Sequence, residues 1–149
     1  MTPTITMSDK SDPDVRAAIG APLFSFNVAR SGSDDNFCHL VLTLTLPGAT
    51  EIIGGLWGHT GWDYLHIEYL VVPEAIRGSG IGRELMRQAE DEAVRRGCHR
   101  AWLDTFSFQA RGFYERLGYT VFGMLEDFPP GHSRFFLKKL LIPATVQQA

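Results

Sequence analysis

Cysteine is scarce in this chain, and long apolar runs are absent. Cys38 and Cys98 are the 2 cysteines among 149 residues. They stand far apart inside apolar segments, so we expect buried, reduced thiols rather than a disulfide framework. No apolar run reaches the roughly 18–20 residues that would cross a bilayer. The polar stretch 1–10 lacks the apolar core of a secretory signal, and the chain is therefore expected to be cytoplasmic, without membrane contact.

The chain also lacks a concentration of positive charge. Its 14 Lys and Arg residues stand against 17 Asp and Glu residues, a formal net charge of −3. Binding to a nucleic-acid backbone needs the opposite balance, so no nucleic-acid partner is predicted. A weakly acidic chain is compatible with a cationic substrate. The histidines also lack the spacing of metal ligands along the chain, so no metal is predicted. They are His39, His59, His66, His99 and His132.

What is present is the composition of an ordinary globular protein, with 44% hydrophobic and 21% charged residues. The length predicts a single domain over 1–149 with a substantial core. Residues 1–36 are the hardest to interpret. The pair Asp12-Pro13 predicts a helix start that continues to about Ile19, and Pro22 argues against a longer helix.

From residue 37 onward, strand and helix patterns alternate. Apolar and β-branched runs predict strands over 37–46, 51–57, 64–72, 100–105, 119–126 and 134–140. The pair Gly54-Gly55 suggests a bulge or a close approach of two strands. A four-residue apolar period predicts a helix from Ser79 or Gly80 to Arg96. Ser107 is a candidate cap for a second helix ending at Gly118. This order predicts an α/β or α+β fold with partly parallel strands.

Residues 71–85, VVPEAIRGSGIGREL, form the most informative stretch. An apolar strand runs through a glycine-rich turn into a helix whose N-terminus is open. Backbone N–H groups and the helix dipole there favour an anion, and Arg77 adds a forked cation suited to phosphate. The dinucleotide fingerprint would need a third glycine at position 83, which is Arg83, and the Gly-Lys-Ser/Thr of a P-loop is missing. The ligand is therefore expected to be another phosphate compound.

Two motifs carry a resemblance to a known family. Arg77-x-x-Gly80-x-Gly82 resembles the acetyl-CoA pyrophosphate loop of the Gcn5-related N-acetyltransferases (GNAT). Residues 110–119, ARGFYERLGY, resemble the second hallmark of that family, an Ala followed by Tyr, a basic residue, Leu-Gly and an aromatic. Either match alone is short, but the pair at this separation is specific. The resemblance covers about residues 51–140.

The resemblance implies a fold and a cofactor. The fold is a strongly twisted mixed sheet with splayed central strands and helices on both faces. The cofactor is acetyl-CoA, with coenzyme A as the product. The implied pyrophosphate loop runs through Arg77, Gly78, Ser79, Gly80, Ile81, Gly82 and Arg83. The pantetheine arm would pair with the strand end Leu70, Val71 and Val72, and further cofactor contacts are implied at Ser107, Ala110, Phe113 and Tyr114. Many members carry Asn where this chain has Ser107, so an amide contact there is not implied.

The resemblance also implies catalytic roles. Tyr114 matches the tyrosine that serves the departing sulfur of coenzyme A as general acid; the position also suits a core tyrosine. Glu68, in Ile67-Glu68-Tyr69-Leu70, matches the carboxylate that acts as base through water in amine acetyltransferases of the family. Burying a carboxylate in an apolar strand is costly, so Glu68 either has a functional role or faces solvent.

The acceptor side is less defined by sequence. Trp57, His59, Trp62, Tyr64, His66 and Glu68 are candidate substrate contacts, and the loop 128–133 lies where members often place a lid. The leading hypothesis is an N-acetyltransferase acting on a primary amine of a small molecule or peptide. A non-catalytic acyl-CoA sensor or scaffold is the alternative, and a longer acyl group or an oxygen acceptor is a third option. The sequence leaves the oligomeric state open, a homodimer included.

Overall fold

The computed structural model describes residues 1–141 of the chain. Its contacts divide the molecule into two units, residues 1–35 and residues 36–149. The first unit holds a single helix, α1 (Pro13–Ser31), and the second holds the remaining elements. A single domain over the whole chain stays a prediction.

Helix α1 begins where the sequence predicts and extends further. The Asp12 side chain accepts the N–H of Asp14 at 2.8 Å, and Pro13 takes the first helical position. The helix then continues through Pro22, although an interior proline costs roughly 3 kcal/mol. It ends at Gly32, whose left-handed conformation (φ 73°) terminates it. The predicted limit near Ile19 is therefore wrong.

The second unit is a six-stranded mixed sheet with helices, as the sequence predicts. The strand order is β1-β2-β3-β4-β6-β5, and every neighbouring pair is antiparallel except β3–β4, which is parallel. The strands are β1 (Cys38–Leu44), β2 (Gly54–Gly61), β3 (Tyr64–Val71), β4 (Arg100–Phe106), β5 (Thr120–Glu126) and β6 (Ser133–Leu140). The helices are α2 (Ile81–Arg95) and α3 (Arg111–Arg116), and the 3-10 turn η1 (Glu74–Ile76) precedes α2.

The sheet opens between β3 and β4. Their parallel pairing ends at Ile67↔Leu103. Strand β3 nevertheless continues to Val71 and β4 to Phe106. Along this gap the two strands no longer pair with each other, so their backbone N–H and C=O groups can bind a ligand that carries amides. The opening lies at the carboxyl ends of both strands, beside the loop that leads into α2.

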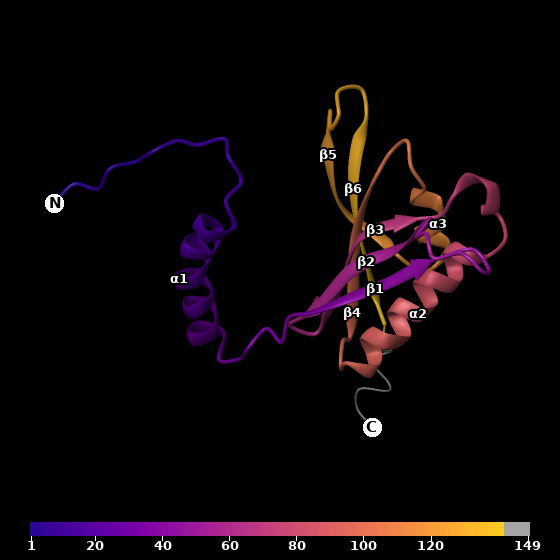
Figure 1. The fold of residues 1–149 in the computed structure, drawn as a ribbon, viewed down its shortest axis with the longest axis horizontal. Helices are drawn as coiled ribbons and strands as arrows, with labels where there is room; N and C mark the ends of the chain where they lie inside the picture. The colour runs from indigo at the N-terminus through magenta and orange to yellow at the C-terminus, as the bar shows by residue number, and fades with distance from the viewer. Residues whose placement is uncertain (142–149) are drawn as a thin grey trace. The chain divides into compact units, whose positions relative to one another are not determined.

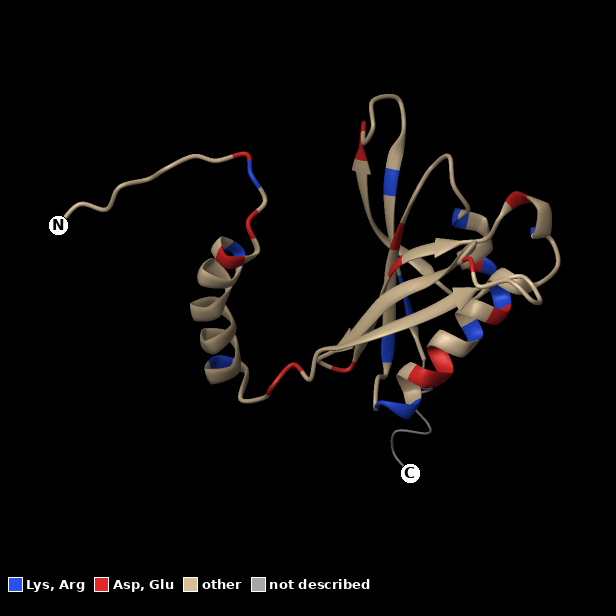
Figure 2. Ribbon diagram, viewed as in Figure 1, with Lys and Arg blue, Asp and Glu red and all other residues tan. Residues whose placement is uncertain are grey.

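Helix α2 lies along β1, β2 and β3 (Figure 1). Its buried side chains are Leu85, Met86, Ala89 and Ala93, the face that the four-residue period predicts. They join one apolar core with side chains from the strands, among them Leu65, Leu103 and Leu137. The outer face of α2 mixes Arg with Asp and Glu, whereas β1 and β2 carry no charged residue of either sign (Figure 2).

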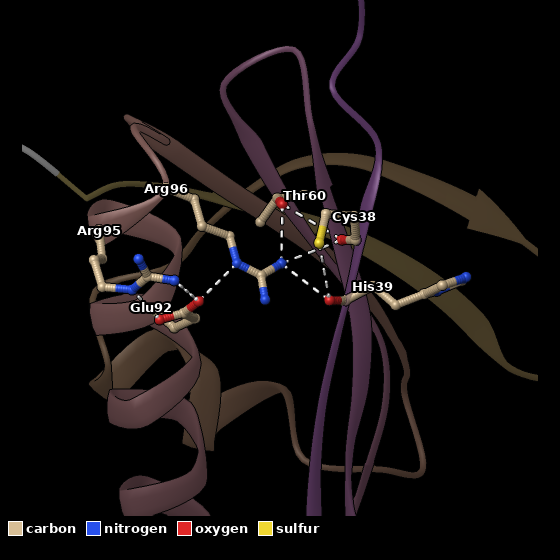
Figure 3. A network of polar contacts seen from close by, with 6 residues as sticks. All are labelled: Cys38, His39, Thr60, Glu92, Arg95 and Arg96. Carbon is tan, nitrogen blue, oxygen red and sulfur yellow. Dashed lines mark hydrogen bonds and ion pairs between the residues drawn. The ribbon is translucent and has the colours of Figure 1, made fainter.

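Arg96 fixes the end of α2 to the edge of the sheet (Figure 3). Its Nη1 donates to the carbonyl oxygens of Cys38 (3.3 Å) and His39 (3.0 Å) and to Oγ1 of Thr60 (3.2 Å). Its Nε donates to Glu92 Oε1 at 2.8 Å. One guanidinium thereby joins β1, β2 and α2, which holds β2 in position next to the candidate site.

Of the local expectations, the burial of Cys38 is wrong, and of the two alternatives at Gly54-Gly55 the close approach is confirmed. Cys38 is exposed at the start of the edge strand β1, and only Cys98 is buried. Gly54-Gly55 is a close approach, because a Cβ at Gly55 would collide with the carbonyl oxygen of Leu42. The β2–β3 bulge lies instead at Trp57/Gly58.

The cap of α3 also differs from the prediction. Ala110 takes the N-cap position, and no side chain caps the helix. Ser107 Oγ instead accepts the N–H of Ser133 at 3.1 Å, tying the end of β4 to the start of β6. Within residues 1–141, no helix is long and apolar enough to cross a membrane.

Candidate functional site

The loop before α2 has the geometry of an anion site. Gly78 (φ 79°) and Gly80 (φ 85°) are left-handed, and a Cβ at either position would meet no protein atom within 4 Å. Gly80 is the N-cap of α2 and offers no side chain to its first-turn N–H groups. Those groups lack intrahelical acceptors, so they remain for a bound oxyanion.

Two polar side chains of the same loop hold its shape. Arg77 Nε donates to the carbonyl oxygen of Val72 at 3.0 Å, which fixes the guanidinium beside the loop. Ser79 Oγ donates to the carbonyl oxygen of Ile76 at 2.6 Å. A cation, open backbone donors and vacant space around the glycines thus lie together, and these residues fit a pyrophosphate.

The two sequence motifs meet in space. A Cβ at Gly82, in the first turn of α2, would lie 3.4 Å from Cζ of Phe113 on α3 and 3.6 Å from Cγ2 of Val72. These are ordinary van der Waals distances, so the first turn of α2 lies against α3 and the end of β3. This contact connects the pyrophosphate loop to the segment that carries Tyr114.

Glu68 lies where the sheet opens. It is the first residue of β3 beyond the last β3–β4 pair, Ile67↔Leu103. It is also the extra residue of the bulge, since Trp57 pairs with Tyr69 and Gly58 pairs with Ile67. Bulges often re-aim side chains beside active sites. The Glu68 Oε1 atom lies 3.2 Å from Nδ1 of His59 on β2.

His66 completes a cluster with these two residues. Its ring stacks on Trp102 of β4, with centroids 3.7 Å apart and planes 3° from parallel. It also meets the ring of His59 edge-on at 5.1 Å. Its Nε2 is buried and has no hydrogen-bond partner within residues 1–141. Burial lowers the pKa of His66, and the nearby His59 adds to this effect, so the imidazole is neutral at pH 7.

Tyr114, on α3, is half-buried beside the core. Burial raises the pKa of its phenol to about 12, and the charge of Asp104 contributes in the same direction. The hydroxyl is therefore protonated at neutral pH and is a donor. No protein group in the described chain, residues 1–141, hydrogen-bonds to it. Its neighbour Tyr119 differs, since that hydroxyl donates to Glu90 Oε1 at 3.0 Å.

Asp104 was missed by sequence reasoning. It lies on β4 beyond the last β3–β4 pair and receives Nε of Arg134 at 2.6 Å. Its charge acts on both His66 and Tyr114, so it lies within electrostatic range of both groups. A carboxylate inside an apolar strand was the signal that identified Glu68, and the same signal applies here.

The loop 128–133 packs against the end of β4. The Phe106 and Phe128 rings are 5.9 Å apart, and those of Phe108 and His132 are 5.0 Å apart. The Arg134 guanidinium lies over Phe128 at 5.2 Å. An aromatic wall therefore borders the opening on the β4 side, which is consistent with a lid over the acceptor.

The other sequence candidates are placed as follows. His59, His66 and Glu68 come together on β2 and β3. Trp62 is in the β2–β3 turn, and Tyr64 is the first residue of β3, opposite Arg100. Trp57 pairs with Tyr69 across the bulge. The cofactor contacts implied by the resemblance stay predictions, and among them the pyrophosphate loop fits best.

The β3–β4 pair opens next to the free N-terminus of α2. This arrangement is that of an α/β protein with a site suited to a phosphate ligand that carries amide groups. The model of the acetyltransferase (GNAT) family matches residues 12–119. Acetyltransferase Atu2258 of Agrobacterium fabrum is 40% identical over 134 residues, covering 89% of this chain and 96% of that protein. Blasticidin-S acetyltransferase of Streptomyces morookaense is 34% identical over 137 residues, covering 91% and 94%.

A solved structure agrees with these relatives. The crystal structure of an acetyltransferase candidate from Agrobacterium tumefaciens has a TM-score of 0.86 at 38% identity, covering 92% of this chain and 98% of that one. The chain belongs to the GNAT acetyltransferase family. It is an N-acetyltransferase of a family that uses acetyl-CoA.

Proposed function

We propose that this enzyme transfers the acetyl group of acetyl-CoA to a primary amine of a small molecule, by direct attack within a ternary complex. One observation supports this most: Glu68 is the first residue of β3 past the point where the sheet opens. A carboxylate there lies beside the strand edge to which an amide-bearing arm would bind. The proposal keeps the cytoplasmic location and the absence of nucleic-acid partners that the sequence predicts.

The acceptor class rests on charge and on one relative. Glu68 and Asp104 supply carboxylates at the opening, which suit an acceptor that arrives as a cation. The relative named blasticidin-S acetyltransferase acts, by its name, on a small molecule. We extend that class, not that compound, to this chain.

The chain's residues then divide the chemistry. The acetyl thioester is supplied by the cofactor. The ammonium must lose a proton before it can attack, because its pKa of roughly 10.4 leaves no lone pair at neutral pH. Glu68 takes this proton through water, and His59 holds the carboxylate by the contact at 3.2 Å. Tyr114 donates a hydrogen bond to the departing sulfur.

Replacing Glu68 with Gln tests the base. The amide keeps the size of the side chain and can still accept a hydrogen bond from His59, so the fold should persist. We expect turnover at pH 7 to fall by roughly 10²-fold or more. Part of the rate should return as the pH approaches the pKa of the acceptor ammonium, because the free amine then forms without a base. The measurement is turnover against pH for the parent and the variant.

Glu51→Gln is the matched control, because Glu51 is exposed and lies before β2. Its profile should overlay that of the parent. A Glu68→Gln profile with the same shape as the parent's would remove Glu68 from the proton transfer and leave the acetyltransferase assignment intact.

A further inference from the structure

The strongest unassigned feature is the cluster of His59, His66 and Glu68. One ligand atom from each residue lies within 4.8 Å of the others. We propose that these three side chains form a site for a divalent transition-metal cation, with Zn²⁺ as the representative ion. Imidazole and carboxylate are ligands that Zn²⁺ accepts, and two histidines disfavour Mg²⁺ and Ca²⁺.

Sheet geometry brings the ligands together. His59 on β2 is the direct register partner of His66 on β3. Glu68 follows His66 by two residues, so both side chains point to the same face. Glu68 is itself the extra residue of the bulge at Trp57/Gly58, and it lies next to His59. The spacing of these residues along the sequence does not reveal the cluster, because the ligands come from two strands.

One pair of ligand atoms already has the spacing found around a small cation. With bonds of 2.0–2.2 Å, neighbouring ligand atoms of a tetrahedral Zn²⁺ lie roughly 3.4 Å apart. The Nδ1 atom of His59 and Oε1 of Glu68 are already 3.2 Å apart. The side chains of these two residues are 26% and 35% exposed, so rotation can adjust them toward His66. Water would occupy the fourth position.

Two independent observations concern His66. Its Nε2 is buried without a partner in the described residues, and such an atom is costly to leave unsatisfied. Its ring is held against Trp102 with the planes 3° from parallel, which restricts its orientation before any ion binds.

The site has a functional consequence that rests on the proposed function. A cation bound to Glu68 would occupy the carboxylate that otherwise takes the proton of the amine. Zn²⁺ should therefore inhibit turnover, and a chelator should restore it. Asp104 lies near the cluster but is paired with Arg134 at 2.6 Å, so its charge supports the cation only from outside the ligand set.

Direct metal binding tests the proposal without any assay of activity. The full chain, stripped by chelator, is titrated with Co²⁺ while visible absorption is recorded, and with Zn²⁺ by calorimetry. We expect one equivalent to bind and Zn²⁺ to displace Co²⁺. His66→Phe keeps a ring on Trp102 and removes both nitrogens. His66→Phe and Glu68→Gln, each made alone, should weaken metal binding at least tenfold, since loss of even an outer-shell partner costs ~10–100-fold.

Two control variants complete the experiment. His99→Phe makes the same change outside the cluster, and Cys38→Ser removes the exposed thiol; both should bind as the parent does. The absence of saturable binding, equal binding in His66→Phe, or a loss confined to Cys38→Ser would each overturn the metal site. A chain that binds Co²⁺ at this cluster but lacks acetyltransferase activity would refute the proposed function and leave the metal site standing.

Discussion

Tyr114→Phe is expected to lower the turnover rate by roughly 10²–10⁴-fold, the usual contribution of one general acid. The hydroxyl is protonated at neutral pH because burial raises its pKa to about 12. A thiol has a pKa of about 8.5, so complete proton transfer to the leaving sulfur is uphill. The hydroxyl therefore acts chiefly as a hydrogen-bond donor to charge that develops in the transition state.

Because this interaction strengthens only in the transition state, the affinity for acetyl-CoA should barely change. Stability should also persist, since no protein group within residues 1–141 accepts or donates a bond at this hydroxyl. Pre-steady-state kinetics measure the rate of the chemical step, calorimetry measures the affinity for acetyl-CoA, and thermal unfolding measures the stability. Loss of fold or of cofactor binding would make Tyr114 a core residue instead.

Tyr119→Phe is the matched control. Its hydroxyl is buried and donates to Glu90, which also pairs with Lys139 at 2.7 Å. Removing it should cost about 1.5–3 kcal/mol of stability, the range for bonds to charged groups, while turnover by the folded enzyme stays at the parent level. The two tyrosines, whose rings lie 6.2 Å apart, should thus show opposite profiles. Equal losses of turnover in both variants would contradict the assignment.

Gly80→Val is expected to weaken acetyl-CoA binding at least a hundredfold, or roughly 2.8 kcal/mol. The glycine is the N-cap of α2, and its missing side chain leaves space beside the first-turn N–H groups. A valine would fill that space and exclude the pyrophosphate. Left-handed backbone also disfavours valine by about 1–2 kcal/mol, so some stability is lost for a separate reason.

Gly97→Val separates the two effects. Gly97 lies beyond the other end of α2 with φ 92° and open space around its Cβ position, much as Gly80 has φ 85° and open space. Both variants should lose similar stability, and only Gly80→Val should lose cofactor affinity. Calorimetric titration with acetyl-CoA measures the cofactor affinity of both variants. Unchanged affinity in Gly80→Val would show that the loop is not part of the cofactor site.

Much of the fold could be predicted because local signals were strong. Glycines at left-handed positions mark both ends of α2, and the four-residue period of Leu85, Ala89 and Ala93 identifies its buried face. The Ser107 cap failed because its hydroxyl bonds to Ser133, which is 26 residues away. A local propensity cannot anticipate a tertiary contact of that kind.

The site was predictable only in part, for a related reason. Glu68 was identified because a carboxylate inside an apolar strand requires an explanation. Its partner His59 depends on the register of β2 against β3 and on a bulge that no residue type specifies. Asp104 carries the same signal, but its importance depends on where β3 and β4 stop pairing.

The central claim is most directly tested by incubating the purified chain with acetyl-CoA and a panel of small-molecule amines. The panel includes blasticidin S, because a relative at 34% identity is named for it. Coenzyme A release is followed together with the mass of each acceptor. The account predicts that at least one primary amine gains a single acetyl group, with stoichiometric coenzyme A release that Tyr114→Phe largely abolishes. Bound acetyl-CoA without transfer to any amine of the panel, or transfer that persists undiminished in Tyr114→Phe, would contradict it.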